Sequence, residues 1–196
     1  VDTNKFRPSR CAKKRDVLLI IGIVKALYSK YITDTLIKAF NIVCQECKHV
    51  DLQLVIVGSS PEEEPLKHLL SQLNLKEQVT FKEFVDNEAI PSVVRSFDIF
   101  SALSGLDSES FGVAVVEAGT CAKPCVVSDV SGFCEVVERE TTGLIVRRDN
   151  VVDAANALIR LVVDDDLRKT LGDNAREHVV SKYSLDESLR KVCDVY

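Results

Sequence analysis

Short apolar stretches rich in β-branched residues alternate with amphipathic helical stretches along this chain. No hairpin signal joins any two neighbouring apolar stretches. Strands that are joined through helices pair in parallel, because a parallel pair needs a long crossover connection. The pattern therefore predicts an α/β fold, a Rossmann-like parallel sheet with helices on both faces.

Hydrophobic periodicity and turn residues locate the expected elements. Strands are predicted at 16–24, 52–57, 79–81, 98–101, 125–128 and 144–146. Helices are predicted at 32–47, 61–73, 88–96 (with Asn87 as N-cap), 113–122, around Glu135, 151–163, 167–182 and after Ser184. Parallel sheets bind ligands beyond the carboxyl ends of their strands, so the loops that lead into the helices are the candidate site.

Composition excludes several classes of protein. The 196 residues suffice for one domain with a sizeable core, and no apolar run approaches the ~20 residues of a membrane-spanning helix. The net charge of −5 argues against general nucleic-acid binding. The first fifteen residues hold a basic cluster, interpreted as a solvated linker, of Lys5, Arg7, Arg10, Lys13, Lys14 and Arg15. We expect a cytoplasmic protein.

The seven cysteines include one C-x-x-C pair, Cys44 and Cys47, with His49 nearby. A zinc site needs a second pair of ligands at suitable spacing, and none follows. We therefore predict reduced, unliganded thiols that serve as small core residues, no metal site and no cofactor.

One stretch of the sequence combines an apolar helix with two carboxylates. Residues 113–122 are almost wholly small or apolar, yet Glu117 lies among them and Glu109 precedes them. Gly112 allows another group to approach the backbone at the helix start, where free N–H groups attract anions. An anion site flanked by hydrogen-bond acceptors suits a sugar nucleotide.

Glu109 and Glu117 form an E-x7-E pattern that resembles retaining glycosyltransferases of the family-4 type, with the GT-B fold (glycosyl transferases group 1). Further residues of the resemblance are Ala118, Lys123-Pro124, Val127-Ser128-Asp129, Ser131-Gly132, Glu135-Val136-Val137 and Thr142 to Val146. The similarity covers nearly the whole chain, which resembles the C-terminal, donor-binding domain of such enzymes.

The resemblance implies a role for each candidate around the helix start. Glu109 would accept hydrogen bonds from the transferred sugar, and Glu117 from the ribose. The backbone N–H groups of Ser110, Phe111 and Gly112 would bind sugar and phosphates.

Other candidates follow the first three predicted strands. Lys25 and Lys30, after a strand that contains Gly22, match in spacing an Arg and a Lys that clamp the pyrophosphate in the family. With Glu109 they are the candidate catalytic residues. Lys25 replaces the family's arginine, which keeps the charge but loses bidentate geometry. The remaining donor-binding candidates are Gly58, Ser59, Phe84 and Val85.

The resemblance also implies an organisation and partners. Residues 1–15 would be the linker from a missing N-terminal, acceptor-binding domain, and 16–196 the nucleotide-sugar-binding domain. The chain starts at Val1 and has no methionine, as expected of a fragment. The implied partners are a nucleoside diphosphate sugar and the N-terminal domain; peripheral association of the full protein with the inner face of the membrane stays open. The alternative interpretations are half of a nucleotide-sugar epimerase and a non-catalytic nucleotide-binding or interaction domain.

Overall fold

The computed structural model describes residues 1–8, 18–24, 33–58, 63–82, 85–107, 111–185, 187 and 189–190. Its centre is a six-stranded sheet in the order β3-β2-β1-β4-β5-β6, and all of the pairings are parallel. The strands are β1 (Leu18–Val24), β2 (Asp51–Val57), β3 (Val79–Lys82), β4 (Ile99–Ala102), β5 (Cys125–Ser128) and β6 (Gly143–Val146). The predicted parallel sheet is confirmed.

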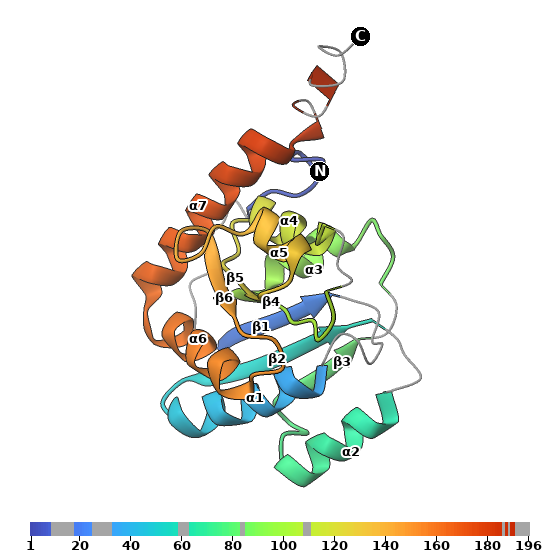
Figure 1. The fold of residues 1–196 in the computed structure, drawn as a ribbon. Coiled ribbons are helices and arrows are strands. Elements are labelled where there is room, and N and C mark those ends of the chain that lie inside the picture. The colour runs from blue at the N-terminus through green and yellow to red at the C-terminus, as the bar shows by residue number, and fades with distance from the viewer. Residues whose placement is uncertain are drawn as a thin grey trace.

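Helices cover both faces of the sheet, as predicted (Figure 1). One face carries α1 (Thr33–Glu46), α2 (Glu63–Leu73) and α6 (Val151–Val163). The other carries α3 (Ile90–Ser96), α4 (Val113–Thr120) and α5 (Ser131–Val136). The last long helix, α7 (Asp165–Tyr183), lies at the β6 side of the sheet (Figure 1). It contacts the apolar core on both faces, through Leu171 on one and Val179 on the other.

Alternation along β1 divides the core into these two clusters. Ile21 and Ile23 are fully buried against α1 and α6 on one face. On the opposite face Gly22 leaves space for the ring of Phe97, which a Cβ atom at position 22 would meet at 2.2 Å. Packing against Phe97 therefore requires a glycine at position 22. The strand is buried on both faces, as its apolar sequence predicts.

Three helix boundaries differ from the prediction by two residues. The helix predicted at 167–182 begins at Asp165, because Asp164 is its N-cap and accepts the Leu167 N–H at 2.8 Å.

The helix predicted to start at Glu88 with Asn87 as its N-cap begins at Ile90 instead; Ala89 is the N-cap, and a turn bonds the Ala89 N–H to the Asp86 carbonyl at 2.8 Å. Pro91 explains the position, because proline is tolerated in the first turn of a helix.

The helix predicted at 113–122 ends at Thr120. Ala122 adopts φ 56°, and the Lys123 N–H returns to the Ala118 carbonyl at 3.0 Å. Pro124 disfavours helical geometry at the residue before it, so the chain turns into β5 here. Beyond α7, the Ser184 hydroxyl accepts a hydrogen bond from the Glu187 N–H at 3.3 Å, which agrees with the predicted cap.

Residues 1–8 lie against α4 and the end of α7 (Figure 1). The Val1 nitrogen donates to the Tyr183 carbonyl at 2.7 Å, and the Val1 carbonyl accepts from the Leu185 N–H at 3.0 Å. Phe6 is 6% exposed and belongs to the second apolar cluster. The division into a linker and a domain at residue 15 stays a prediction. Across the described ranges, none of the helices has the length and hydropathy to span a membrane.

Candidate functional site

The strand order changes direction between β1 and β4. The chain leaves β1 toward β2 on one side of the sheet and leaves β4 toward β5 on the other. The connecting helices α1 and α4 lie on opposite faces of the sheet. In open α/β sheets such a switch point, at the carboxyl ends of the two strands, is the place of the ligand crevice.

Helix α4 begins at this switch point with an unusual backbone. Gly112 is its N-cap and adopts φ 72° and ψ 50°, in the left-handed region that favours glycine. A Cβ atom there would lie 2.8 Å from the ring of Phe133 in α5. The Gly112 carbonyl accepts the N–H of Val115 at 2.8 Å, which starts the helix. The N–H groups of a first helical turn lack partners within the helix and attract anions.

Glu117 lies one turn further along α4 and is half-buried. It lines a cavity of about 270 Å³ with Phe6, Phe111 and Tyr183. Burial raises the pKa of its carboxyl, against the opposing charge of Lys5. Within the part of the chain that the structure describes, its carboxylate has no hydrogen-bond or ion-pair partner. A desolvated carboxylate without a partner is costly, which leaves its oxygens available to a ligand's hydroxyls.

Hydrogen bonds connect the loop after β4 to the end of β5 and the start of α5. The buried Ser104 N–H donates to the Ser128 hydroxyl at 3.0 Å, at the end of β5. Three residues later the Asp107 carboxylate accepts both the N–H and the hydroxyl of Ser131. These bonds lower the pKa of Asp107 and hold the loop that leads toward α4.

The other candidates from the sequence occupy different positions. Gly22 is buried within β1, whereas Gly58 directly follows β2 and donates its N–H to the Lys82 carbonyl at 3.0 Å. Val85, shortly after β3, is half-buried against the second cluster. Of these candidates, Phe111 and Glu117 line the same cavity, and Gly112 lies between them in the sequence as the N-cap of α4. The predictions for Lys25, Lys30, Ser59, Phe84, Glu109 and Ser110 lie outside the described residues.

Three residues that shape this region were not predicted from the sequence. Phe133 fills the space beside Gly112, Asp107 binds Ser131, and the Tyr183 ring meets the Phe111 ring at 5.3 Å between centroids. No local pattern reveals these contacts, since each joins separate elements. Glu135 contributes its backbone carbonyl, which accepts a hydrogen bond from the Tyr183 hydroxyl at 3.0 Å.

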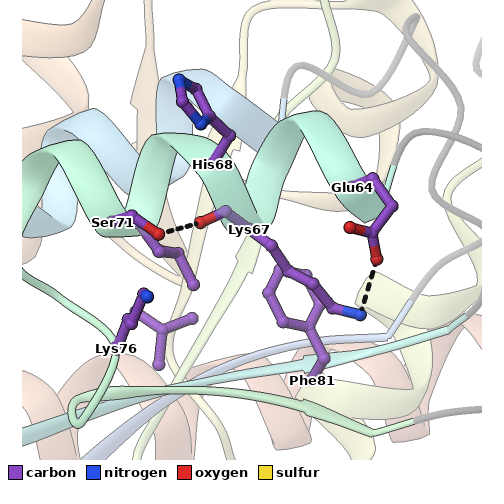
Figure 2. A pocket seen from close by; sticks show the side chains of 8 residues that line it. Glu64, Lys67, His68, Ser71, Lys76 and Phe81 are labelled. Carbon is purple, nitrogen blue, oxygen red and sulfur yellow. Dashed lines mark hydrogen bonds and ion pairs between the residues drawn. The ribbon is translucent and has the colours of Figure 1, made fainter.

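A second pocket, of about 480 Å³, lies between α2 and the outer strand β3 (Figure 2). The ammonium group of Lys67 at its rim pairs with Glu63 at 2.8 Å and Glu64 at 3.0 Å. Its floor includes Leu70 and Phe81. No residue predicted for donor binding lines this pocket.

The C-x-x-C pair lies at the end of α1. Cys44 and Cys47 are free thiols, and burial raises the pKa of Cys44 to about 11. A thiol with a raised pKa is a poor nucleophile and a poor metal ligand. In the described ranges no cluster of three or more histidine, cysteine or acidic residues could hold a metal ion.

A parallel sheet with this strand order and with helices on both faces defines a Rossmann-like α/β domain. The profile of the family "Glycosyl transferases group 1" matches residues 4–178. The chain belongs to this family.

Curated relatives and solved structures agree with this assignment. The chain is 31% identical over 182 residues to D-inositol 3-phosphate glycosyltransferase of Corynebacterium jeikeium, covering 90% of this chain and 43% of the relative. It is 31% identical over 146 residues to alpha-D-kanosaminyltransferase of Streptomyces kanamyceticus, covering 74% and 37%. Sucrose-phosphate synthase of Thermosynechococcus elongatus superposes with a TM-score of 0.88 at 26% identity, over 100% of this chain and 50% of the other.

One of the solved structures that the chain matches over nearly its whole length is an isolated domain. The C-terminal domain of a glycosyl transferase group 1 family protein (LpcC) from Francisella tularensis superposes with a TM-score of 0.84 at 24% identity, over 94% of this chain and 99% of that one. The curated relatives named above are longer, and the chain spans roughly two fifths of their length. The chain thus has the fold of a C-terminal domain of this family.

Proposed function

We propose that this chain is the donor-binding half of a glycosyltransferase, which moves a hexosyl unit from a nucleoside diphosphate sugar to an acceptor with retention of anomeric configuration. The observation that supports this most directly is Glu117, a half-buried carboxylate without a partner in the described chain, one turn beyond the start of α4. Family membership supplies the reaction class. A structure of a relative, Anabaena HepE, has been determined in complex with UDP-glucose.

The diphosphate of the donor would bind at the amino end of α4, where Phe111 and Gly112 offer backbone N–H groups. The ribose hydroxyls would donate hydrogen bonds to Glu117. In the reaction the bond between the sugar's anomeric carbon and the phosphate oxygen breaks, a bond to the acceptor oxygen forms, and the acceptor proton is released. The nucleoside diphosphate leaves with the bonding electrons, so its negative charge grows in the transition state.

The resemblance assigns the charged catalytic roles. Lys25 and Lys30 would stabilise the departing diphosphate, as preorganised cations do in phosphate chemistry. Glu109 would bind hydroxyls of the transferred sugar. We propose that these groups suffice without a metal ion or another cofactor.

The acceptor site and the complete activity belong to a larger protein in this proposal. An N-terminal domain would bind the acceptor and close over the crevice. We propose a cytoplasmic enzyme, peripheral to the membrane where the acceptor is attached to a lipid.

Saturation-transfer NMR of the chain against nucleoside diphosphates and their sugars tests donor binding. We expect signals from the ribose and the base, reduced by competition with the matching nucleoside diphosphate. Inorganic pyrophosphate alone should compete weakly, because it lacks the ribose that Glu117 would bind. Absence of specific binding across uridine, guanosine, adenosine and thymidine diphosphates would contradict the proposal.

A further inference from the structure

Tyr183, the last residue of α7, connects three parts of the molecule that are distant in sequence. Its ring meets the Phe111 ring edge to face, with 5.3 Å between centroids and 77° between planes. Its hydroxyl donates to the Glu135 carbonyl at the end of α5, at 3.0 Å. Its own carbonyl accepts the Val1 nitrogen at 2.7 Å. The side chain is half-buried, so these contacts hold the ring in place.

Phe111 directly precedes Gly112, the N-cap of α4. A ring held at residue 111 restricts the peptide groups that carry the N–H groups of Phe111 and Gly112, because a single backbone rotation separates each of them from the Phe111 Cα atom. On the other side, the ring of Phe133 fills the space beside the Gly112 Cα atom. The start of α4 is therefore held between α5 and the end of α7.

The two aromatic side chains hold this helix start in different ways. Phe133 is 1% exposed and belongs to the second apolar cluster, so its contact is part of the core. Tyr183 and Phe111 are only half-buried, at the margin of that cluster and of the cavity beside Glu117. A change at Tyr183 can therefore alter the helix start while most of the core stays packed.

We propose that Tyr183 is a positioning residue for donor binding, which orients the start of α4 through Phe111. The inference rests on the proposed function. Tyr183 itself touches neither the phosphates nor the sugar in this arrangement. Its ring keeps the N–H groups of residues 111–112 aimed into the crevice, and preorganised donors bind an anion better than donors that must first be ordered.

The two functions of the tyrosine can be separated by substitution. Tyr183→Phe keeps the ring against Phe111 and loses the hydrogen bond to Glu135. Tyr183→Leu keeps apolar bulk and loses the edge-to-face ring contact as well. Both variants should lose some thermal stability, whereas only Tyr183→Leu should bind uridine or guanosine diphosphate roughly threefold to tenfold more weakly, from the size of an aromatic pair interaction.

The experiment is calorimetric titration of the chain well below the melting temperature of each variant, with uridine and guanosine diphosphates as probes. Uridine and guanosine, which lack phosphates, serve as comparators. Because Tyr183 orients the phosphate-binding end of α4, Tyr183→Leu should weaken diphosphate binding more than nucleoside binding. Ser181→Ala, in the same last turn of α7, removes an exposed hydroxyl bonded to the His178 carbonyl and should leave both affinities unchanged.

The outcomes distinguish the two proposals. If the wild-type chain binds neither diphosphate, donor binding itself fails, and the role of Tyr183 fails with it. If the wild-type chain binds and Tyr183→Leu binds equally well, or loses nucleoside and diphosphate affinity in the same proportion, the positioning role is wrong while donor binding stands. A loss of diphosphate affinity in Tyr183→Phe as large as in Tyr183→Leu would also refute the ring contact as the cause.

Discussion

Asp107 accepts two hydrogen bonds from Ser131, a residue 24 positions further along the chain: the Ser131 N–H donates at 2.7 Å and its hydroxyl at 2.9 Å. The carboxylate thereby caps the start of α5, whose own N-cap, Val130, has no side-chain hydrogen bond. The loop after β4 and the loop after β5 are thus joined beside the switch point.

We expect Asp107→Ala to weaken nucleoside diphosphate binding roughly threefold to tenfold, because two charge-assisted hydrogen bonds no longer hold the loop that leads to α4. The melting temperature should fall by a few degrees, because the substitution also removes the cap of α5. Titration calorimetry and thermal unfolding measure the two effects. Glu140→Gln is the control, because it perturbs an exposed carboxylate bonded twice to Arg160, at the other end of β6. Equal affinity in Asp107→Ala would remove Asp107 from the site.

Glu117→Gln should lower nucleotide affinity by roughly tenfold or more, because the amide is a weaker acceptor than a charged carboxylate for hydroxyl donors. Stability without ligand should stay constant or rise at neutral pH. The reason is that the pKa of Glu117 is raised in the folded state, so its ionisation opposes folding.

The effect of Glu117→Gln on stability should depend on pH. The contribution of Glu117 to stability is fully present below the unfolded value of 4.5 and is lost as pH rises through the raised folded pKa. Any advantage of the Glu117→Gln variant should therefore shrink in acid. The exposed Glu77→Gln is the control for both measurements. A variant that unfolds more readily at neutral pH yet binds nucleotide normally would show that Glu117 is structural.

Gly112→Ala should destabilise the domain by at least about 2 kcal/mol. A left-handed conformation costs an alanine about 1–2 kcal/mol, and the overlap with Phe133 adds an overpacking cost of about 1–3 kcal/mol. A double-mutant cycle with Phe133→Leu separates these causes by denaturant unfolding. If the overlap matters, the double variant should be more stable than the sum of the single effects predicts, and strict additivity would leave backbone strain as the sole cause.

His178 should make stability depend on pH below neutrality. Burial lowers its pKa from 6.5, Lys182 lowers it further, and the nearby Glu138 raises it, with its carboxylate 3.2 Å from Nδ1. The ring of Tyr183 lies 5.9 Å away, and no described residue bonds to the buried Nε2 atom. The neutral imidazole is thus favoured by the fold, so its stabilising contribution is present above pH 6.5 and is lost as pH falls through the folded pKa.

The measurement is the free energy of unfolding at several pH values between 8 and 5, which are about the limits of histidine titration. His178→Gln should flatten the decline, because the titrating group is removed. The exposed His49→Gln should leave the decline as in the wild type. An identical pH profile in His178→Gln would exclude this histidine as the cause.

The periodic sequence predicted the sheet, its parallel connections and most of the helices. It did so because burial fixes the spacing of apolar residues within each element. The apolar run of β1 and the alternating apolar and polar faces of α1 are examples. Boundaries were less predictable where backbone geometry decides them. Asparagine is a favoured N-cap residue, so Asn87 was predicted to start the helix. Pro91 and the turn from Asp86 instead place the start of α3 at Ile90.

The candidate site was predictable only in part. A glycine before an apolar helix and a carboxylate within it indicated the start of α4 correctly, because both are locally anomalous. The partners of these residues come from other elements: Phe133 beside Gly112 and Tyr183 beside Phe111. Such contacts depend on how α5 and α7 pack across the sheet, which a single sequence does not encode as a local pattern. Gly22 illustrates the same limit, because the side chain that excludes a larger residue there is Phe97, from the end of α3.

The order of the strands has a consequence for how the domain folds. The central contact between β1 and β4 includes the hydrogen bond from the Ile20 N–H to the Asp98 carboxylate, across a separation of 78 residues. Contacts of such long range form slowly, because a large loop must close before they stabilise the chain. The β1–β2–β3 part and the β4–β5–β6 part can each assemble from nearer neighbours first. The switch point lies on the seam between these two parts, and the groups proposed to bind the donor come from both: Lys25 and Lys30 follow β1, whereas Gly112 and Glu117 follow β4. The complete donor site therefore requires the seam to have closed.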